Sequence, residues 1–335
     1  MKRIISIILF LASLFTLSAR NKALLVGVSN YPEESGWCTL SSVRDVEKLG
    51  HAISPSFELT TLIDDKATYH GIISALEEMS SKAQKGDTIF IHFSCHGQQM
   101  LSNDCSEVDY LDEALIPFDA FSQETAFYKG ECHLKDDVLS QYIQGIRSQV
   151  GSKGLVVVTL DSCHSDSMDK GSEEDKTSTI YRGGLSLFGG NHLTIDSLVA
   201  LKERWRTKQV SDLYNDTLAH VLYLSACNSY EKNREILVDS VWYGSLSHAV
   251  ISAFQDFGFS DILQWRKAVL ENMKKSVPFQ TPQTRSSLDF QDNELILIEI
   301  AKEDSVPFGM KNILLTLSVI ILLFLFIWRI MKLRK

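Results

Sequence analysis

Two residues of this chain have side chains suited to nucleophilic catalysis, and each follows an apolar run. Cys163 comes shortly after residues 155–160, and His96 comes shortly after residues 88–94. Acyl transfer needs a nucleophile, a base that takes its proton and passes it to the leaving group, and N–H donors for the oxyanion. Cys163, His96 and the backbone N–H of Gly97 supply these three parts. The pattern therefore predicts chemistry through a thioester.

The other cysteines and histidines have simpler interpretations. Cysteine is among the most buried of side chains, so we interpret the five remaining cysteines as core residues or disulfide partners; they are Cys38, Cys95, Cys105, Cys132 and Cys227. We interpret His92 and His164 as core or supporting residues. A metal site built from Cys163, His164 and His96 lacks a fourth ligand at a recognisable spacing.

The elements that must position the catalytic pair form an alternating pattern. Continuously apolar runs, typical of strands buried on both faces, alternate with segments of helical character, which predicts a mostly parallel sheet between helices. The runs are residues 23–28, 88–94, 155–160 and 221–225, and the helical segments are residues 71–83 and 136–146. Because ligands bind at the carboxyl ends of such strands, we expect His96 and Cys163 at one crevice.

A change of composition divides the body of the chain. Residues 165–191 are rich in Ser, Asp, Glu, Lys and Gly, which predicts an exposed, mobile loop. It separates residues 20–164 from residues 192–303, where residues 294–300 predict a further strand. Any self-cleavage should fall within this loop, which has basic residues at Lys170, Lys176 and Arg182.

The two ends of the chain predict export and a membrane anchor. Residues 1–19 have a basic start, an apolar stretch and a small-residue end, as signal peptides do. Residues 312–328 contain no charge and just reach the length that spans a bilayer. Residues 329–335 carry four positive charges, which favour the cytoplasmic side. Residues 20–303 would then form a periplasmic or extracellular domain on a single-pass anchor in the lipid bilayer.

The charge of the chain limits its partners. The formal net charge is −9 at pH 7, so we expect no binding to nucleic acid and an attraction for basic peptides.

Several segments resemble the metacaspases and bacterial caspase-like cysteine peptidases (peptidase family C14, clan CD). The most specific are Phe-Ser-Cys-His-Gly, ending at Gly97, and Asp-Ser-Cys-His-Ser, centred on Cys163. Further matches, in the family's order, are residues 23–31, 112–119, 224–231 and 280–283. The resemblance covers roughly residues 22–300 and implies the caspase-hemoglobinase fold, an α/β fold with a mostly parallel central sheet and helices on both faces, here followed by one C-terminal transmembrane helix.

The resemblance also implies roles for individual residues. It makes His96 and Cys163 the catalytic dyad, and it places Asp45, Ser94 and Asp161 in the S1 pocket, which binds the P1 side chain before the scissile bond. Two carboxylates there suit Arg or Lys at P1. Four positions depart from the family pattern, namely Ser42, Arg44, Cys95 and Asp166.

Calcium activates some members of this family through clustered aspartates. The resemblance implies a possible calcium site at Asp112, Asp136, Asp137 and Asp169, and otherwise no cofactor is required. An equally good interpretation of Asp136 and Asp137 is that they cap the N-terminus of a helix.

The sequence thus predicts a cysteine endopeptidase that cleaves peptides or proteins after Arg or Lys. Two alternatives remain open: a catalytically silent membrane receptor or scaffold, which the intact His96 and Cys163 disfavour, and a transpeptidase that passes the same thioester to an amine.

Overall fold

The computed structural model describes residues 21–101, 111–163, 180–183, 187–189, 215–228 and 231–288. All of them belong to one compact unit, Met1–Leu295, and the second unit, Ile296–Lys335, lies outside the described residues. The predicted signal peptide, the strand at 294–300, the anchor at 312–328 and the basic tail lie outside them too. Within the described ranges, no helix is both long enough and apolar enough to cross a membrane.

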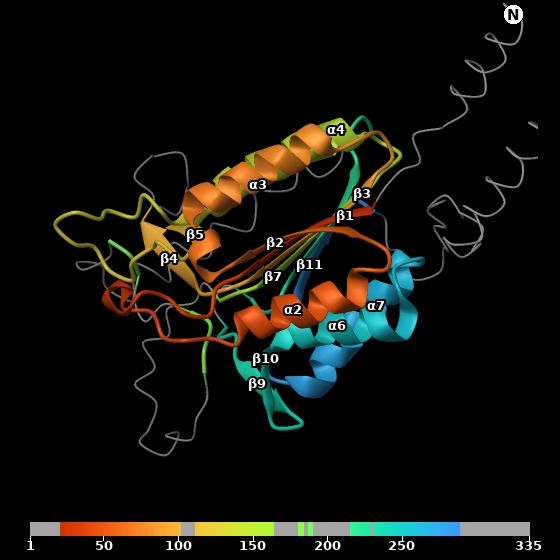
Figure 1. Ribbon diagram of the computed structural model, residues 1–335. Coiled ribbons are helices and arrows are strands. Elements are labelled where there is room, and N and C mark those ends of the chain that lie inside the picture. The colour runs from red at the N-terminus through yellow and green to blue at the C-terminus, as the bar shows by residue number, and fades with distance from the viewer. Residues whose placement is uncertain are drawn as a thin grey trace, which may run out of the picture. The chain divides into compact units, whose positions relative to one another are not determined.

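A six-stranded sheet forms the centre of the described unit (Figure 1). Its strands, in spatial order, are β11 (Gln283–Ser286), β8 (His220–Ser225), β7 (Leu155–Asp161), β3 (Thr88–Ser94), β1 (Asn21–Gly27) and β2 (Glu58–Ile63). All neighbouring strands are parallel except β11, which is antiparallel to β8. The four strands predicted from apolar runs are confirmed as β1, β3, β7 and β8.

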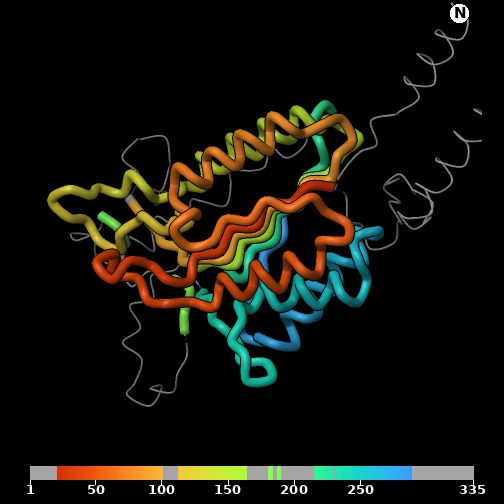
Figure 2. Tube along the Cα trace, viewed as in Figure 1, coloured from red at the N-terminus to blue at the C-terminus, as the bar shows by residue number. Residues whose placement is uncertain are grey.

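Helices cover both faces of this sheet, as predicted (Figures 1 and 2). One face carries α3 (Tyr69–Lys82) and α4 (Asp136–Val150), and the other carries α2 (Ser42–Ile53), α6 (Ser245–Phe257) and α7 (Ile262–Ser276). Two short 3-10 helices span Glu33–Ser35 and Asp64–Lys66. The predicted capping of α4 by its aspartates is wrong in position, because Lys135 is the N-cap and Asp136 and Asp137 lie in the first turn.

The core explains why the central strands are continuously apolar. Every residue of β3 is buried, since helices lie on both of its faces. On the α6 and α7 side, the ring of Phe90 packs edge to face with Phe254 and Trp265, with centroids 5.3 and 6.1 Å away. Such close packing holds β3 and its neighbour β7 in place, and it therefore also positions the residues that follow their carboxyl ends.

Two small antiparallel sheets adjoin the central sheet. One contains β4 (Gly97–Leu101), β5 (Leu111–Leu115) and β6 (Leu134–Lys135), and the other contains β9 (Glu235–Val238) and β10 (Val241–Gly244). β4 begins three residues after β3 ends, so this sheet starts at the carboxyl edge of the central sheet.

Candidate active site

The predicted catalytic residues lie at neighbouring strand ends. β3 and β7 are parallel partners in the register Ser94↔Asp161. His96 follows β3 by two residues, and Cys163 follows β7 by two residues. The sheet therefore brings them to one edge, although 67 positions separate them in the sequence.

The surroundings of His96 decide which ring nitrogen can act as a base. The imidazole is buried and stacks on Trp37 with a centroid distance of 4.9 Å. Its Nε2 lies 2.9 Å from the backbone oxygen of Cys38. Because a carbonyl oxygen only accepts hydrogen bonds, Nε2 carries the proton and Nδ1 keeps its lone pair. Nδ1 is buried and has no hydrogen-bond partner among the described residues, so it is available to accept a proton.

Burial sets the protonation state of His96. Burial lowers the pKa to about 4, even though the hydrogen bond to the Cys38 carbonyl raises it. The ring is therefore neutral at pH 7, which is the form that a general base requires.

Cys163 is buried beside a second thiol. Its Sγ donates to the backbone oxygen of Glu231 at 3.0 Å, and Cys227 Sγ donates to the same oxygen at 3.4 Å. A hydrogen bond to Cys163, and then burial, raise the pKa of Cys227 well above its usual value. Burial raises the pKa of Cys95 to about 12. Neither neighbouring thiol is thus a ready rival nucleophile.

Two backbone N–H groups converge on one oxygen at this edge. Gly97 N donates to the backbone oxygen of Arg182 at 3.0 Å, and Cys163 N donates to the same oxygen at 3.1 Å. Paired N–H donors beside a nucleophile have the arrangement that stabilises an oxyanion. The Gly97 N–H is the donor expected from the sequence, and the N–H of Cys163 is a second donor that the sequence did not indicate.

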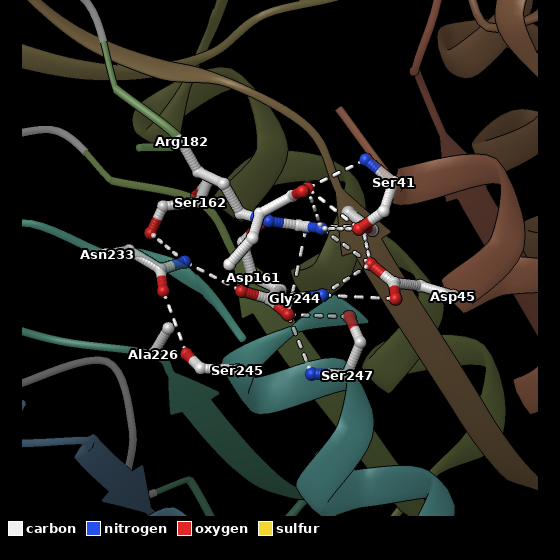
Figure 3. Close-up of polar contacts among 12 residues, drawn as sticks. Ser41, Asp45, Asp161, Ser162, Arg182, Ala226, Asn233, Gly244, Ser245 and Ser247 are labelled. Carbon is white, nitrogen blue, oxygen red and sulfur yellow. Dashed lines mark hydrogen bonds and ion pairs between the residues drawn. The ribbon is translucent and has the colours of Figure 1, made fainter. Parts of the chain in front are cut away.

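Three carboxyl groups surround the guanidinium of Arg182 (Figure 3). Nη2 lies 2.7 Å from Asp45 Oδ2 and 2.9 Å from Glu235 Oε1, while Nη1 lies 3.8 Å from Asp161 Oδ2. Nη1 also donates to Ser94 Oγ at 2.6 Å. The structure therefore brings the three predicted S1 residues together and adds Glu235; we call these four residues the acidic pocket.

The carboxyl groups are held by polar groups from both sides of the site. Asp161 accepts from Asn233 Nδ2 at 2.7 Å and from the backbone N–H of Ser247 at 2.7 Å. Asp45, on α2, accepts from the backbone N–H of Gly244 at 3.1 Å. Gly244 also leaves room for the guanidinium, because a Cβ added there would lie 2.5 Å from Arg182 Cζ.

The two aspartates titrate differently although both are fully buried. Burial raises the pKa of Asp45 to about 6; Arg182 lowers it and Asp161 raises it further. Burial would also raise the pKa of Asp161, but Arg182 and the hydrogen bonds from Ser247 and Asn233 outweigh this effect and lower it. Asp161 thus stays ionised at neutral pH, and Asp45 ionises close to neutral pH.

The backbone before Arg182 pairs with a neighbouring segment as an added strand would. Arg182 N donates to the backbone oxygen of Asn233 at 3.0 Å, and Glu235 N donates to the backbone oxygen of Ile180 at 2.9 Å. Between them, Tyr181 and Arg234 form an antiparallel bridge. This is the main-chain pattern by which a sheet edge binds an extended peptide.

Other predicted features are placed differently or lie outside the described residues. The expectation that residues 165–191 are exposed is wrong for Arg182, whose side chain is fully buried, because the acidic pocket compensates its charge. Arg44, which departs from the family pattern, contacts the backbone oxygen of Trp242 at 3.3 Å. Five cysteines are free thiols, and Cys105 lies outside the described residues; the five are Cys38, Cys95, Cys132, Cys163 and Cys227.

The predicted calcium ligands are only partly described. Asp169 lies outside the described residues, and Asp112 pairs with Lys135 Nζ at 2.5 Å. Burial, followed by Glu113, Asp137 and Asp112, raises the pKa of Asp136 to about 8. In the part of the chain that is described, no three His, Cys, Asp or Glu side chains form a group that could hold a metal ion. The described residues therefore do not fit a calcium site, and calcium stays a prediction.

An open parallel sheet with a buried Cys–His pair, paired N–H donors and an acidic pocket at its carboxyl edge defines a caspase-like α/β protein. A family profile for the caspase domain matches residues 20–291, and the chain belongs to that family.

Similar proteins agree with this assignment. Metacaspase-1A of Neurospora crassa is 26% identical over 162 residues, which cover 45% of this chain and 33% of that protein. Metacaspase-7 of Arabidopsis thaliana is 29% identical over 176 residues, which cover 48% and 39%. The matched region thus spans about two fifths or less of these curated relatives.

A solved structure supports the fold. The crystal structure of a protein from Geobacter sulfurreducens matches with a TM-score of 0.53, 20% identity, and coverage of 80% of this chain and 93% of that chain. At this identity the likeness concerns the fold alone.

Proposed function

We propose that the protein is a cysteine endopeptidase that cleaves peptide bonds after Arg, and less efficiently after Lys. One observation carries this proposal: an arginine is already bound at the candidate active site, with its side chain in the acidic pocket and its carbonyl oxygen between two N–H donors. Membership of the caspase domain family and the metacaspase relatives support a peptide or protein substrate.

Each part of the site has a chemical role in this proposal. His96 Nδ1 takes the thiol proton of Cys163, and the thiolate attacks the carbonyl carbon of the P1 residue. The N–H groups of Gly97 and Cys163 stabilise the oxyanion. His96 then passes the proton to the leaving amine, and water hydrolyses the thioester.

The acidic pocket explains why arginine should be preferred to lysine at P1. The guanidinium of Arg182 contacts Asp45, Glu235 and Ser94 from two different nitrogens. A lysine ammonium is a single point charge and cannot make this forked set of contacts. The carboxylates would repel an acidic P1 residue. We therefore expect no cleavage after aspartate, the residue at which caspases cleave.

The proposed cellular location of the enzyme rests on the signal-peptide pattern of residues 1–19 and on residues 312–335. We infer an exported domain, held at the bilayer by the segment at residues 312–328, with the basic tail in the cytoplasm. Digestion of intact spheroplasts by an added protease should then remove the body and spare the tail. Access to the tail alone would mean the opposite topology.

A panel of fluorogenic peptides that differ only at P1 tests the function directly. Purified full-length protein should hydrolyse the Arg peptide fastest, the Lys peptide more slowly, and the Asp peptide not at all. The same panel, run with added calcium and with a chelator, tests the predicted calcium activation. Cys163→Ala and His96→Ala should both abolish hydrolysis. Cys132→Ala, which removes a thiol outside the site, is the matched control. An inactive wild-type protein would favour a silent receptor, and product joined to an added amine would favour a transpeptidase.

A further inference from the structure

A second cysteine lies beside the candidate nucleophile, at the ends of two neighbouring strands. Cys163 follows β7 by two residues and Cys227 follows β8 by two residues, and these strands are parallel partners in the register Leu160↔Ser225. The pairing continues beyond β8, because the backbone N–H of Ala226 donates to the Leu160 oxygen at 3.1 Å. Neighbouring strands lie about 4.8 Å apart, a separation that suits the Cα atoms of a disulfide.

One fixed acceptor holds the two thiols together. Cys163 Sγ and Cys227 Sγ lie 3.0 and 3.4 Å from the same backbone oxygen, that of Glu231, and a hydrogen bond joins the two thiols directly. Glu231 is itself held, since its carboxylate accepts from the backbone N–H and the hydroxyl of Thr281, both at 2.7 Å. The sulfur atoms are therefore close neighbours in a well-supported part of the site.

The other described thiols are placed less well for a reaction with Cys163. Cys38 Sγ lies 3.5 Å from His96 Nε2, which is not the ring nitrogen that serves Cys163 in the proposed reaction. Cys95 and Cys132 pack in the apolar core together with side chains of α3 and α4. Among the described cysteines, Cys227 is thus the one best placed to bond with Cys163.

We propose that Cys163 and Cys227 form a reversible disulfide when a hydroperoxide oxidises the nucleophile, and that this bond inactivates the peptidase and protects Cys163 from irreversible oxidation. Cys227 is then a resolving thiol, which takes no part in peptide cleavage. The inference concerns the regulation of the proposed active site, and only its effect on activity rests on the proposed function.

The reaction balances with the hydroperoxide as the sole oxidant. His96 takes the proton of Cys163, and the thiolate attacks one peroxide oxygen. The O–O bond breaks, and the leaving oxygen takes the proton from His96, so hydrogen peroxide gives water and a sulfenic acid on Cys163. The sulfur of Cys227 then attacks the sulfur of Cys163, and the hydroxyl group leaves as water with the proton of Cys227. Two thiols are oxidised by two electrons, and one peroxide is reduced.

Cys227 should react only after the nucleophile has been oxidised. In the reduced protein, the hydrogen bond to Cys163, then burial, and then the negative charge of Cys163 raise the pKa of Cys227, so Cys227 stays protonated. A sulfenic acid carries no such charge, and the part of the shift that the charge causes is lost. The second thiol therefore does not compete with Cys163 for substrate, yet it can resolve the oxidised form.

Burial favours this internal disulfide over a bond to a thiol from solution. The side chains of Cys163 and Cys227 are only 1% and 7% exposed. A hydroperoxide is smaller than the peptide that the site is proposed to admit, so it can reach Cys163 by the same route. A larger thiol compound would have to approach a covered sulfur atom, whereas Cys227 is already beside it.

The first experiment treats full-length protein with hydrogen peroxide and maps its disulfides by mass spectrometry without reduction. Wild-type protein should give two peptides joined through Cys163 and Cys227. Hydrolysis of the Arg peptide should be lost in proportion to the joined fraction, because the thiolate is the nucleophile, and it should return after treatment with dithiothreitol. Cys132→Ala, which removes a thiol outside the site, should behave as wild type.

The second experiment removes the resolving thiol. Cys227→Ser keeps a hydrogen-bond donor for the Glu231 oxygen and should hydrolyse the Arg peptide before oxidation. After peroxide treatment its Cys163 should remain a sulfenic acid that dimedone labels, and longer treatment should convert it to a sulfinic acid, so that dithiothreitol no longer restores activity. Wild-type protein should take up little dimedone. Should Cys227→Ser unfold, Cys227→Ala replaces the thiol without adding a polar group.

Definite results would overturn the inference. Oxidised wild-type protein in which Cys163 forms no disulfide, or forms one with a different cysteine, would contradict the pairing with Cys227. Equal recovery of activity in wild-type and Cys227→Ser protein after prolonged oxidation would contradict the protective role. Wild-type protein that forms the predicted disulfide but never hydrolyses the Arg peptide would instead refute the proposed peptidase function, because the disulfide is detected by mass and not by activity.

Discussion

Replacing Glu235 by Gln should weaken cleavage after Arg by about 5- to 30-fold, because Glu235 is the carboxyl group of the acidic pocket that the sequence did not predict. Its Oε1 lies 2.9 Å from Arg182 Nη2. At an effective dielectric constant near 20, that separation gives a gross attraction of roughly 6 kcal/mol. Desolvation of both charges offsets most of it. The charged hydrogen bond exceeds a neutral one by about 1 to 2 kcal/mol, and Gln keeps the neutral bond.

The assay compares kcat/KM for peptides with arginine or citrulline at P1. Citrulline has the shape of arginine without its charge, so the ratio of the two values isolates the charge term. We expect this ratio to fall by the same factor in Glu235→Gln. Glu34→Gln, which removes an exposed carboxyl group, is the control for net charge. An unchanged ratio in Glu235→Gln would refute the reasoning, because it would mean that Glu235 does not contact the P1 side chain.

Three further predictions concern the same site. Gly244→Ala should nearly abolish cleavage after Arg, because its Cβ would lie 2.2 Å from Asp161 Oδ2 and 2.5 Å from the bound guanidinium. The control Gly145→Ala, whose Cβ would have its nearest neighbour at 3.9 Å, should leave kcat/KM unchanged. Equal activities of the two variants would show that Gly244 does not border the P1 side chain. Inhibition by agmatine, a small guanidinium ligand, should strengthen as pH rises through the pKa of Asp45, which is about 6 with Arg182 bound; Asp45→Asn should flatten this dependence in a titration of the inhibition constant. Cys163→Ala protein should lose thermal stability as pH falls from about 6.5 towards 4. Burial lowers the pKa of His92 and of His96 to about 4, so the unfolded chain binds protons more readily than the folded protein. A melting temperature that stays constant across this range would show that the two rings are not buried in neutral form.

The sequence determined the central sheet because strands that are buried on both faces are continuously apolar, and such runs can be recognised without the structure. Residues 88–94 and 155–160 read as continuous apolar runs, and they became β3 and β7 with boundaries within one residue. The short antiparallel strands β9 and β10 were missed, since four-residue strands at a partly exposed edge have weak periodicity.

The sequence also indicated half of the candidate site. His96, Gly97, Cys163 and Asp161 directly follow or end predicted strands, so strand order alone placed them together. Asp45 lies on α2, and only its resemblance to a family motif marked it. The structure brings it to within 2.7 Å of Arg182 because α2 packs beside β1 and β3.

Only the tertiary structure decided which residues complete the acidic pocket and what occupies it. Glu235 begins a short strand with no chemical signature, and it reaches the site because its backbone pairs with Ile180. Arg182 lies in a polar segment whose composition predicts exposure, yet it is buried. Burial of an arginine depends on carboxyl groups 21 to 137 positions away in the chain, and local composition carries no information about such distant partners.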